Sequence, residues 1–337
     1  AFAAVGPDTM AKILFTSGST SNPKGVETTQ AMMCVNQAQI ASILPFLMDR
    51  PPKILDWLPW NHTFGANYNF NLILWHGGTL YIDGGKPVPG LIDRTVANLT
   101  EIQSTIHFNV PRGFDMLVSH LETDASLRGT FFADLDLIFY AGAALPQNLW
   151  RRLEAVSIEA RGERVMMISG WGSTETAPMA TTVHFPIERA GIIGLPAPGT
   201  DIKMGDNDGK SELRVRGPNV TPGYWRRPDL TDAAFDDDGF YRIGDAGKLV
   251  DADDPALGLV FDGRIAEDFK LMSGTWVHVG VLRVKAIAAL TPLAQDVVVA
   301  GDGREDVGLL VFPNLAGCRS LCPDAGDDAT LDDLIGH

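Results

Sequence analysis

The chain has 337 residues, of which 45% are hydrophobic, and a formal net charge of −15. This length and composition suffice for one large hydrophobic core or two domains, and no run of about 18 apolar residues indicates a membrane span. The excess of acidic residues disfavours nucleic acid and anionic membranes as partners.

The cysteines and the first residues bear on the cellular compartment. Cys34, Cys318 and Cys322 are too few for a disulfide framework and have no neighbouring ligands that complete a zinc site. The sequence also begins without the basic and apolar regions of an export signal. We therefore expect a cytoplasmic protein with reduced thiols.

Short apolar runs alternate with segments of helical periodicity through the first half of the chain. Strands are predicted at residues 11–15, 53–58, 79–83, 105–110, 136–140 and 165–169, and helices at 28–44, 63–75, 91–101, 111–121 and from Pro146. This alternation predicts an α/β fold with a mostly parallel sheet. From residue 190, glycine and proline separate short runs, which predicts a small distorted β-barrel. Two strands at 297–300 and 308–312 and the start of a helix at 330–335 predict a further small α/β lobe.

A loop rich in hydroxyl groups and glycine follows the first predicted strand. It reads Thr16-Ser17-Gly18-Ser19-Thr20-Ser21-Asn22-Pro23-Lys24-Gly25. Glycine lets the backbone approach a phosphate, hydroxyl and N–H groups donate hydrogen bonds, and Lys24 adds a positive charge. The order differs from a Walker P-loop, because Pro23 precedes the lysine and Gly25 follows it. The loop predicts a nucleoside triphosphate site, and an ordinary strand-to-helix loop of similar composition is the alternative.

A second run, Gly170-Trp171-Gly172-Ser173-Thr174-Glu175, follows the strand predicted at 165–169. Magnesium prefers oxygen ligands and shares them with a nucleotide, so a carboxylate beside a hydroxyl on a glycine-flanked turn suits a metal-phosphate site. We predict that Glu175 binds Mg²⁺ and that Thr174 binds the α-phosphate. The indole of Trp171 suits either adenine stacking or core packing.

Aromatic side chains surround His62 at the end of another predicted strand. Residues 56–65 carry Trp60, His62 and Phe64 before Gly65. Such a strand end places rings at the mouth of a pocket beyond the carboxyl edge of a sheet. A structural histidine and core aromatic residues are the alternative interpretation.

Four motifs, in this order along the chain, resemble those of the acyl-adenylate-forming superfamily, which includes acyl- and aryl-CoA ligases. They are the loop from Thr16, the run from Gly170 to Glu175, Tyr241-Arg242-Ile243-Gly244-Asp245 and Asp262-Gly263-Arg264. Residues 56–65 and 261–277 are most similar to feruloyl-CoA synthases. The resemblance implies layered sheets with helices, a small distorted β-barrel and a mobile C-terminal α/β lobe. It places the large AMP-binding domain at residues 1–264 and the start of the C-terminal lobe at 265–337.

The resemblance also implies a reaction and its site. ATP and Mg²⁺ activate a carboxylic acid as an acyl-adenylate, and coenzyme A then displaces AMP. The implied catalytic residues are Lys24, Thr174, Glu175 and His62, the last beside the substrate carboxylate. The implied nucleotide-binding residues are Thr16, Ser17, Gly18, Ser19, Thr20 and Gly25 around the phosphates, Gly142, Ala143, Ala144, Trp171 and Gly172 around the adenine, and Asp245 and Arg264 on the ribose. The hinge residue of the family corresponds to Ala266 or Glu267.

The sequence departs from the family pattern in several places. Ser21 and Trp171 stand where the family usually has glycine and tyrosine. The region that precedes the phosphate loop in the family is missing, as is the lysine near the C-terminus, since residues 331–337 contain no lysine and Lys285 is too early. We therefore expect a fragment that is poorly active and marginally folded by itself, because apolar surface meant for burial is exposed.

The predicted substrate is a hydroxycinnamate such as ferulate. Flat rings stack favourably on aromatic side chains, and this part of the chain carries Trp60, Phe64, Tyr68 and Phe70 around His62. Helical spacing predicts that Phe64 and Tyr68 share a face and that Phe70 faces the core. The alternatives are a medium- or long-chain fatty acyl-CoA ligase, an AMP-binding fragment without catalysis, and an adenylation domain that loads a carrier protein.

Overall fold

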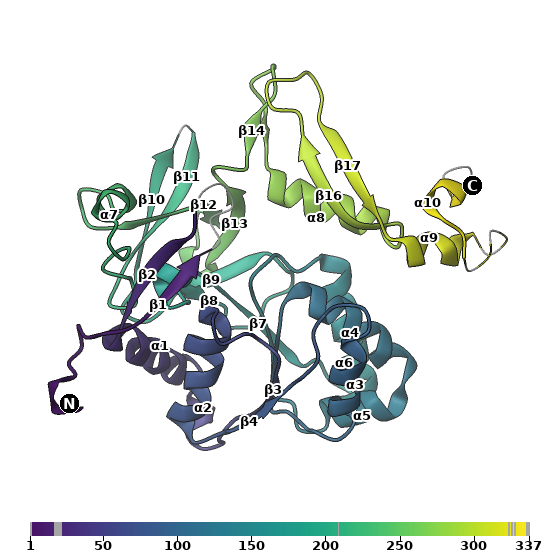
Figure 1. Cartoon of the computed structure of the whole chain (residues 1–337), viewed down its shortest axis with the longest axis horizontal. Helices are drawn as coiled ribbons and strands as arrows, with labels where there is room; N and C mark the ends of the chain where they lie inside the picture. The colour runs from purple at the N-terminus through teal and green to yellow at the C-terminus, as the bar shows by residue number, and fades with distance from the viewer. Residues whose placement is uncertain are drawn as a thin grey trace. The chain divides into compact units, whose positions relative to one another are not determined.

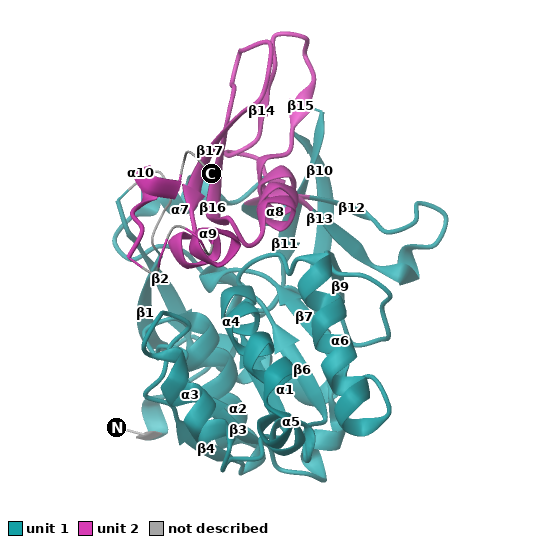
Figure 2. Ribbon diagram, turned by 90° about the vertical axis from the view of Figure 1, so that its right-hand side faces the viewer, with its two compact units in different colours: residues 1–243, 247–261 teal, residues 244–246, 262–337 magenta. Residues whose placement is uncertain are grey.

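The computed structural model describes residues 2–16, 22–207, 209–322, 324, 326 and 328–334. The chain forms two compact units (Figure 2). Unit 1 comprises residues 1–243 and 247–261, and unit 2 comprises residues 244–246 and 262–337. Two strands, β12 (Tyr241–Leu249) and β13 (Leu259–Arg264), contribute residues to both units.

Unit 1 has helices packed on sheets, which confirms the predicted α/β class (Figure 1). Its described helices are η1 (Phe2–Ala4), α1 (Gln30–Ile43), η2 (Pro45–Met48), η3 (Phe64–Phe70), α2 (Asn71–His76), α3 (Ile92–Leu99), α4 (Pro111–Thr123), α5 (Ala125–Phe132), α6 (Gln147–Arg161), η4 (Thr174–Thr176), α7 (Pro228–Ala234) and η5 (Pro255–Leu257). Its other described strands are β1 (Met10–Thr16), β2 (Lys24–Thr29), β3 (Lys53–Asp56), β4 (Thr79–Ile82), β5 (Ile106–Asn109), β6 (Leu137–Tyr140), β7 (Met166–Trp171), β8 (Thr181–Thr182), β9 (Ile192–Pro196), β10 (Asp201–Asn207) and β11 (Lys210–Arg216).

The largest sheet has nine strands in the order β10-β11-β12-β13-β9-β8-β7-β6-β5. Strands β5, β6 and β7 are parallel, as the alternation predicted, and β3 pairs in parallel with β4 in a separate sheet. The glycine- and proline-rich part instead adds antiparallel strands to the nine-stranded sheet. Because β10 and β5 lie at opposite edges of this open order, the described strands do not close into the predicted barrel.

The first predicted strand has a partner that the sequence analysis missed. Strand β1 pairs antiparallel with β2, and Thr16 lies opposite Lys24. The phosphate loop is therefore the connection of a β-hairpin and not a strand-to-helix loop. The predicted helix at residues 28–44 begins later, because Thr29 caps α1 by accepting a hydrogen bond from the backbone N–H of Met32 at 3.2 Å.

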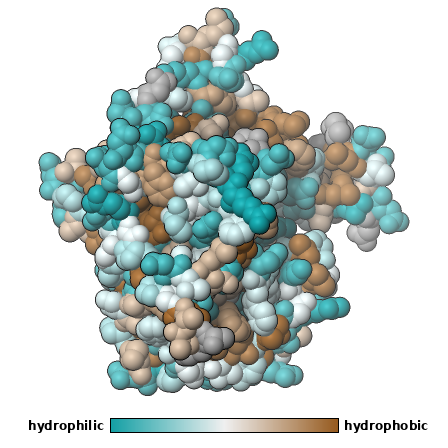
Figure 3. Space-filling view, turned by 60° about the vertical axis from the view of Figure 1, so that its left-hand side comes forward, coloured by the Kyte–Doolittle hydropathy of each residue, from teal (hydrophilic) through white to brown (hydrophobic). Residues whose placement is uncertain are grey.

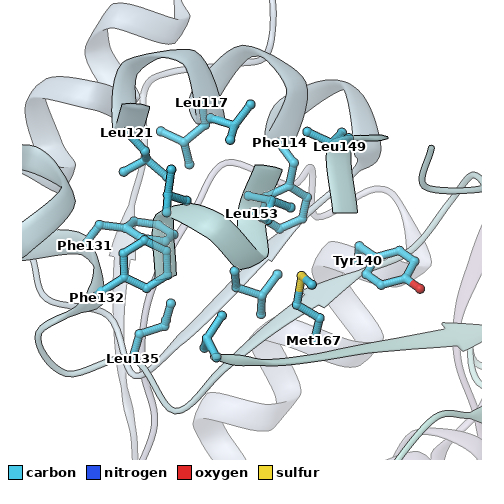
Figure 4. Packing of buried hydrophobic residues seen from close by; sticks show 14 of the residues in the cluster. Phe114, Leu117, Leu121, Phe131, Phe132, Leu135, Tyr140, Leu149, Leu153 and Met167 are labelled. Atoms are coloured by element: carbon cyan, nitrogen blue, oxygen red, sulfur yellow. The ribbon is translucent and has the colours of Figure 1, made fainter. Parts of the chain in front are cut away.

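Strand β6 is buried on both faces. Successive side chains of a strand point to opposite sides, so Ile138 and Tyr140 join one apolar cluster while Leu137 and Phe139 join another. Figure 4 shows the first cluster, in which the side chains of α4, α5 and α6 meet those of the sheet: Phe114, Leu117, Leu121, Phe131, Phe132, Leu149 and Leu153 lie near Tyr140 and Met167. This packing holds the carboxyl end of β6, where the predicted adenine turn begins.

His107 on β5 lies inside the first of these clusters of rings and aliphatic chains. Its ring centroid is 5.6 Å from that of Phe114 and 5.0 Å from that of Phe131. Burial lowers the pKa of His107 to about 4, whereas an unfolded histidine titrates near pH 6.5. The unfolded state therefore binds a proton first as the pH falls. The contribution of neutral His107 to stability is complete above about pH 6.5 and is lost toward pH 4.

Replacing His107 with phenylalanine is expected to make the free energy of unfolding less sensitive to acid. Between about pH 7.5 and about pH 4.5, the parent should lose about 2 to 3 kcal/mol more than His107→Phe in urea unfolding. Asp56 has the opposite dependence, because burial raises its pKa to about 6 and its contribution is lost as the pH rises. Asp56 is present in both proteins, so the difference between their losses of unfolding free energy reports on His107 alone. Equal losses in the parent and in His107→Phe would contradict the lowered pKa of His107.

Unit 2 is built from two hairpins and helices. Its described elements beyond β12 and β13 are β14 (Phe269–Lys270), β15 (Trp276–Val277), α8 (Val279–Leu290), β16 (Ala294–Ala300), β17 (Gly308–Pro313), α9 (Leu315–Leu321) and α10 (Leu331–Leu334). Strands β16 and β17 pair antiparallel, and α8 packs on β16 around Ala286, Ala294 and Val297. The strands predicted at 297–300 and 308–312 are confirmed.

Hydrophobic residues on the surface are scattered among hydrophilic ones over the face shown in Figure 3. Large exposed side chains in the described part of the chain include Phe15, Trp60 and Leu310. None of the helices that the structure describes is both long and apolar enough to cross a membrane.

Candidate nucleotide-binding site

The base of the phosphate loop is formed by the hairpin of β1 and β2. Thr16, the last residue of β1, lies opposite Lys24, the first residue of β2, and both are half-buried. Gly25 follows Lys24, and its carbonyl oxygen accepts a hydrogen bond from the backbone N–H of Trp225 at 2.8 Å. The loop residues Ser17, Gly18, Ser19, Thr20 and Ser21 lie outside the described residues. The structure thus brings Thr16 and Lys24 together.

The run after β7 forms a tight turn that carries Glu175. A Cβ atom on Gly172 would lie 2.0 Å from the carbonyl oxygen of Pro178 and 2.5 Å from Oγ1 of Thr176, so this position accepts only glycine. Thr174 is half-buried and begins η4. Glu175 is only 6% exposed. The turn therefore carries a buried glutamate and, one residue before it, a half-buried threonine.

Tyr224 contacts residues of both motifs, and the sequence analysis missed it. Its hydroxyl donates a hydrogen bond to Oε1 of Glu175 at 2.9 Å, and Nζ of Lys24 lies 5.1 Å from its ring centroid. The hydroxyl of Tyr241 is 3.3 Å from that of Tyr224. Burial and the negative charge of Glu175 raise the pKa of both tyrosines, which therefore remain neutral donors. Tyr241 opens the predicted motif that ends at Asp245, whereas Tyr224 belongs to none of the predicted motifs.

Residues 219–225, here called the connecting segment, link the hairpin to the Glu175 turn. The backbone N–H of Thr221 donates a hydrogen bond to the carbonyl oxygen of Glu175 at 2.8 Å. The hydroxyl of Thr221 donates to the carbonyl oxygen of Glu27 at 2.7 Å. Tyr224 forms an antiparallel bridge with Val26. The segment is thus hydrogen-bonded to both motifs, which lie about 150 residues apart in sequence.

The donors around Glu175 suit a magnesium ion that arrives with a nucleotide. Mg²⁺ is commonly bound through one or two carboxylates together with phosphate oxygens of the substrate. Glu175 supplies one carboxylate, and the adjacent Thr174 supplies a hydroxyl. This donor set fits a shared metal-phosphate site, and the predicted roles of both residues stay predictions.

The predicted adenine turn is exposed at the carboxyl end of β6. Gly142, Ala143 and Ala144 are all exposed, and Gly142 has a left-handed φ of 85°, which favours glycine. Trp171 is 7% exposed and packs in a cluster with Leu213 and other apolar side chains. The core packing considered for Trp171 is therefore observed, and adenine stacking stays a prediction.

The residues predicted to bind the ribose belong to unit 2. Nε of Arg264 lies 3.5 Å from Oδ1 of Asp245, so the structure brings these two side chains together. Asp245 is buried and Arg264 is exposed. Ala266 and Glu267 are exposed in the turn that follows Arg264, and the identity of the hinge residue stays a prediction.

His62 has a defined hydrogen bond. Its Nδ1 accepts from the backbone N–H of Phe64 at 3.2 Å. Partial burial lowers the pKa of His62, which favours the neutral ring. With Nδ1 as an acceptor, the proton of the neutral ring is on Nε2, so that nitrogen is the available donor.

The predicted aromatic wall divides into two groups. Phe64 and Tyr68 contact each other at 6.1 Å, as their spacing predicted, but both are buried against the ring of Phe139 in the core. Trp60 is 51% exposed and packs on Phe70 with centroids 5.1 Å apart. The prediction that Phe70 faces the core is wrong, because residues 64–70 form a π-helix whose i→i+5 repeat changes the faces expected from α-helical spacing.

A polar hollow lies at the amino end of β6, opposite the end that leads to Gly142. Arg50, Asp134, Asp136 and Arg161 are among its lining residues. Arg50 pairs with Asp136 at 2.6 Å, and Lys53 pairs with Asp134 at 2.6 Å. These ion pairs have compensating charges, so the hollow is a surface charge network separate from the predicted site residues.

Comparisons with known proteins identify relatives of this chain. A family profile described as AMP-binding enzyme matches residues 2–225. A long-chain-fatty-acid–CoA ligase of Escherichia coli O157:H7 is 29% identical over 265 residues, which cover 72% of this chain and 45% of the relative. The chain therefore spans about half the length of this relative.

Solved structures share the fold. An ATP-bound RpMatB-BxBclM chimera has a TM-score of 0.74 and 24% identity, over 92% of this chain and 59% of the chimera. O-succinylbenzoate coenzyme A synthetase of Bacillus subtilis in complex with AMP has a TM-score of 0.73 and 20% identity, over 95% of this chain and 63% of that chain. At these identities the likeness shows the fold alone. Together with the profile match over most of its length, it leads to one conclusion: the chain belongs to the AMP-binding enzyme family.

Proposed function

We propose that this chain is the nucleotide-binding portion of an ATP-dependent, AMP-forming acid–CoA ligase. The observation that carries the proposal is that Tyr224 contacts both Lys24, through its ring, and Glu175, through its hydroxyl. A cation at the base of a glycine- and hydroxyl-rich loop suits the pyrophosphate end of ATP, and a carboxylate suits its metal ion. The membership in the AMP-binding enzyme family supports the same assignment.

The proposed reaction has two steps. A carboxylate oxygen of the acid attacks the α-phosphorus of ATP in line, and the bond to the bridging oxygen breaks to release pyrophosphate. The thiol of coenzyme A, having lost its proton, then attacks the acyl carbon, and AMP leaves with the electron pair of the anhydride bond. Both steps depend mainly on positioning and on stabilisation of charge.

Each residue of the site has a defined task in this proposal. Lys24 offsets the negative charge of the departing pyrophosphate, and Thr174 donates its hydroxyl hydrogen to an α-phosphate oxygen. Glu175 holds the magnesium ion, which when bound neutralises phosphate charge. His62 donates from Nε2 to the substrate carboxylate and orients it, since its Nδ1 accepts from the backbone.

We propose an aromatic acid related to the hydroxycinnamates as the substrate. The packing of exposed Trp60 on half-buried Phe70, close in sequence to His62, supports this assignment, together with the likeness of residues 56–65 to feruloyl-CoA synthases. A long-chain fatty acid is the second candidate. The name of the Escherichia coli relative favours it, as does the burial of Phe64 and Tyr68, which removes two rings from the aromatic surface.

The aromatic pair gives a test of the substrate class. Trp60→Ala is expected to lower kcat/KM for ferulate up to about tenfold, because one aromatic contact is worth about 0.5 to 1.5 kcal/mol. The measurement is the kcat/KM of the intact protein for ferulate, coumarate, benzoate, octanoate and palmitate. Trp75→Ala removes an exposed tryptophan of α2 and serves as the matched control. A higher kcat/KM for octanoate or palmitate than for ferulate would overturn the aromatic assignment and leave the ligase assignment in place.

A further inference from the structure

We infer that Tyr224 is a positioning residue that couples the magnesium ligand Glu175 to the phosphate-binding Lys24. The inference rests on the proposed function and adds to it a residue outside the motifs from which that function was predicted. Its basis is that one side chain contacts both groups, through its hydroxyl on one side and its ring on the other.

The hydroxyl of Tyr224 acts on the carboxylate. A buried carboxylate needs hydrogen-bond donors, and the hydroxyl of Tyr224 donates to Oε1 of Glu175 at 2.9 Å. This bond fixes the rotation of the carboxyl group, so the direction of its lone pairs is set before a metal ion arrives. Preorganised ligands bind a cation more tightly than mobile ones, because less freedom is lost on binding.

The ring of Tyr224 acts on the lysine. Nζ of Lys24 lies 5.1 Å from the ring centroid, within the range of a cation–π interaction. A lysine side chain has many rotamers, and a ring beside its ammonium group limits the positions that it samples. The ring therefore keeps Lys24 at the end of the loop where the β- and γ-phosphates are proposed to bind.

The backbone keeps Tyr224 in place between the two groups. Within the connecting segment, Tyr224 forms a β-bridge with Val26 of the hairpin. The carbonyl oxygen of Gly223 accepts a hydrogen bond from the backbone N–H of Glu27 at 3.1 Å. On the other side, Thr221 is bonded to the carbonyl oxygen of Glu175 at 2.8 Å. These backbone bonds hold Tyr224 at a fixed position relative to both motifs. One side chain can therefore orient Glu175 and Lys24 together.

Two variants separate the hydroxyl from the ring. Tyr224→Phe keeps the ring beside Lys24 and removes the hydrogen bond to Glu175, whereas Tyr224→Leu removes both. Tyr140→Phe deletes another buried tyrosine hydroxyl, on β6, and is the matched control. The readout is calorimetric binding of ATP and of AMP to the full chain over a series of magnesium concentrations, with the melting temperature of each variant.

Tyr224→Phe is expected to raise the magnesium concentration for half-maximal ATP binding about tenfold, with AMP binding in the absence of metal unchanged. Tyr224→Leu should in addition weaken ATP binding at saturating magnesium by about threefold or more, because Lys24 loses the ring that positions it. AMP binding should not weaken in this way, since AMP lacks the phosphates that Lys24 is proposed to contact. A magnesium dependence of Tyr224→Phe equal to that of Tyr140→Phe would overturn the inference. A parent protein that binds no ATP with magnesium would instead overturn the proposed function itself.

Discussion

Glu175→Gln is expected to lower acid-dependent exchange of pyrophosphate into ATP by about two to three orders of magnitude. The amide keeps an oxygen that accepts the hydrogen bond of Tyr224, so the buried turn retains its contact at 2.9 Å. The change removes one negative charge from the site proposed for Mg²⁺, and the loss of a single charge-stabilising group in an active site has effects of about this size. The magnesium concentration for half-maximal rate should rise as well.

A surface glutamate supplies the control for this substitution. The Glu188 side chain is 91% exposed, and Glu188→Gln changes the net charge by the same amount away from the turn. Its exchange rate should match that of the parent. If Glu175→Gln retained the parental rate and magnesium dependence, Glu175 would not be the metal ligand, whatever the acid substrate.

Gly172→Ala is expected to lower the free energy of unfolding by about 3 kcal/mol and to abolish magnesium-dependent ATP binding. The added methyl group would meet the backbone oxygen of Pro178 at 2.0 Å and Oγ1 of Thr176 at 2.5 Å. Backbone atoms cannot move aside cheaply, so overpacking here displaces the turn that carries Glu175. Urea unfolding and ATP calorimetry measure the two effects.

Gly129→Ala is the matched control for this glycine. Gly129 lies in α5, where an added Cβ meets nothing within 4 Å, and alanine favours a helix by about 1 kcal/mol over glycine. This variant should be as stable as the parent or slightly more stable. Similar unfolding free energies for Gly172→Ala and the parent would show that the turn adapts to a side chain, against the steric argument.

Local chemistry was readable from the sequence because it depends on neighbouring residues. The apolar run that became β6 is buried on both faces, and such strands appear as continuous hydrophobic stretches. Pro111 begins α4, as its fixed φ angle predicted. The hydroxyl-rich loop and the Thr174-Glu175 pair indicated phosphate and metal chemistry by residue type alone.

The tertiary structure decided which of these residues meet. Strand β2 forms by pairing with β1, and its short sequence from Lys24 to Thr29 has no apolar run that identifies a strand. Tyr224 reaches Glu175 and Lys24 through contacts across 49 and about 200 residues, and pairings of such separation leave no periodic trace in a sequence. The π-helix likewise turned Phe70 toward Trp60 by changing the repeat of the backbone. Residue types thus determined the available chemistry, while long-range packing determined which groups act together, because only the folded chain fixes distances between remote side chains.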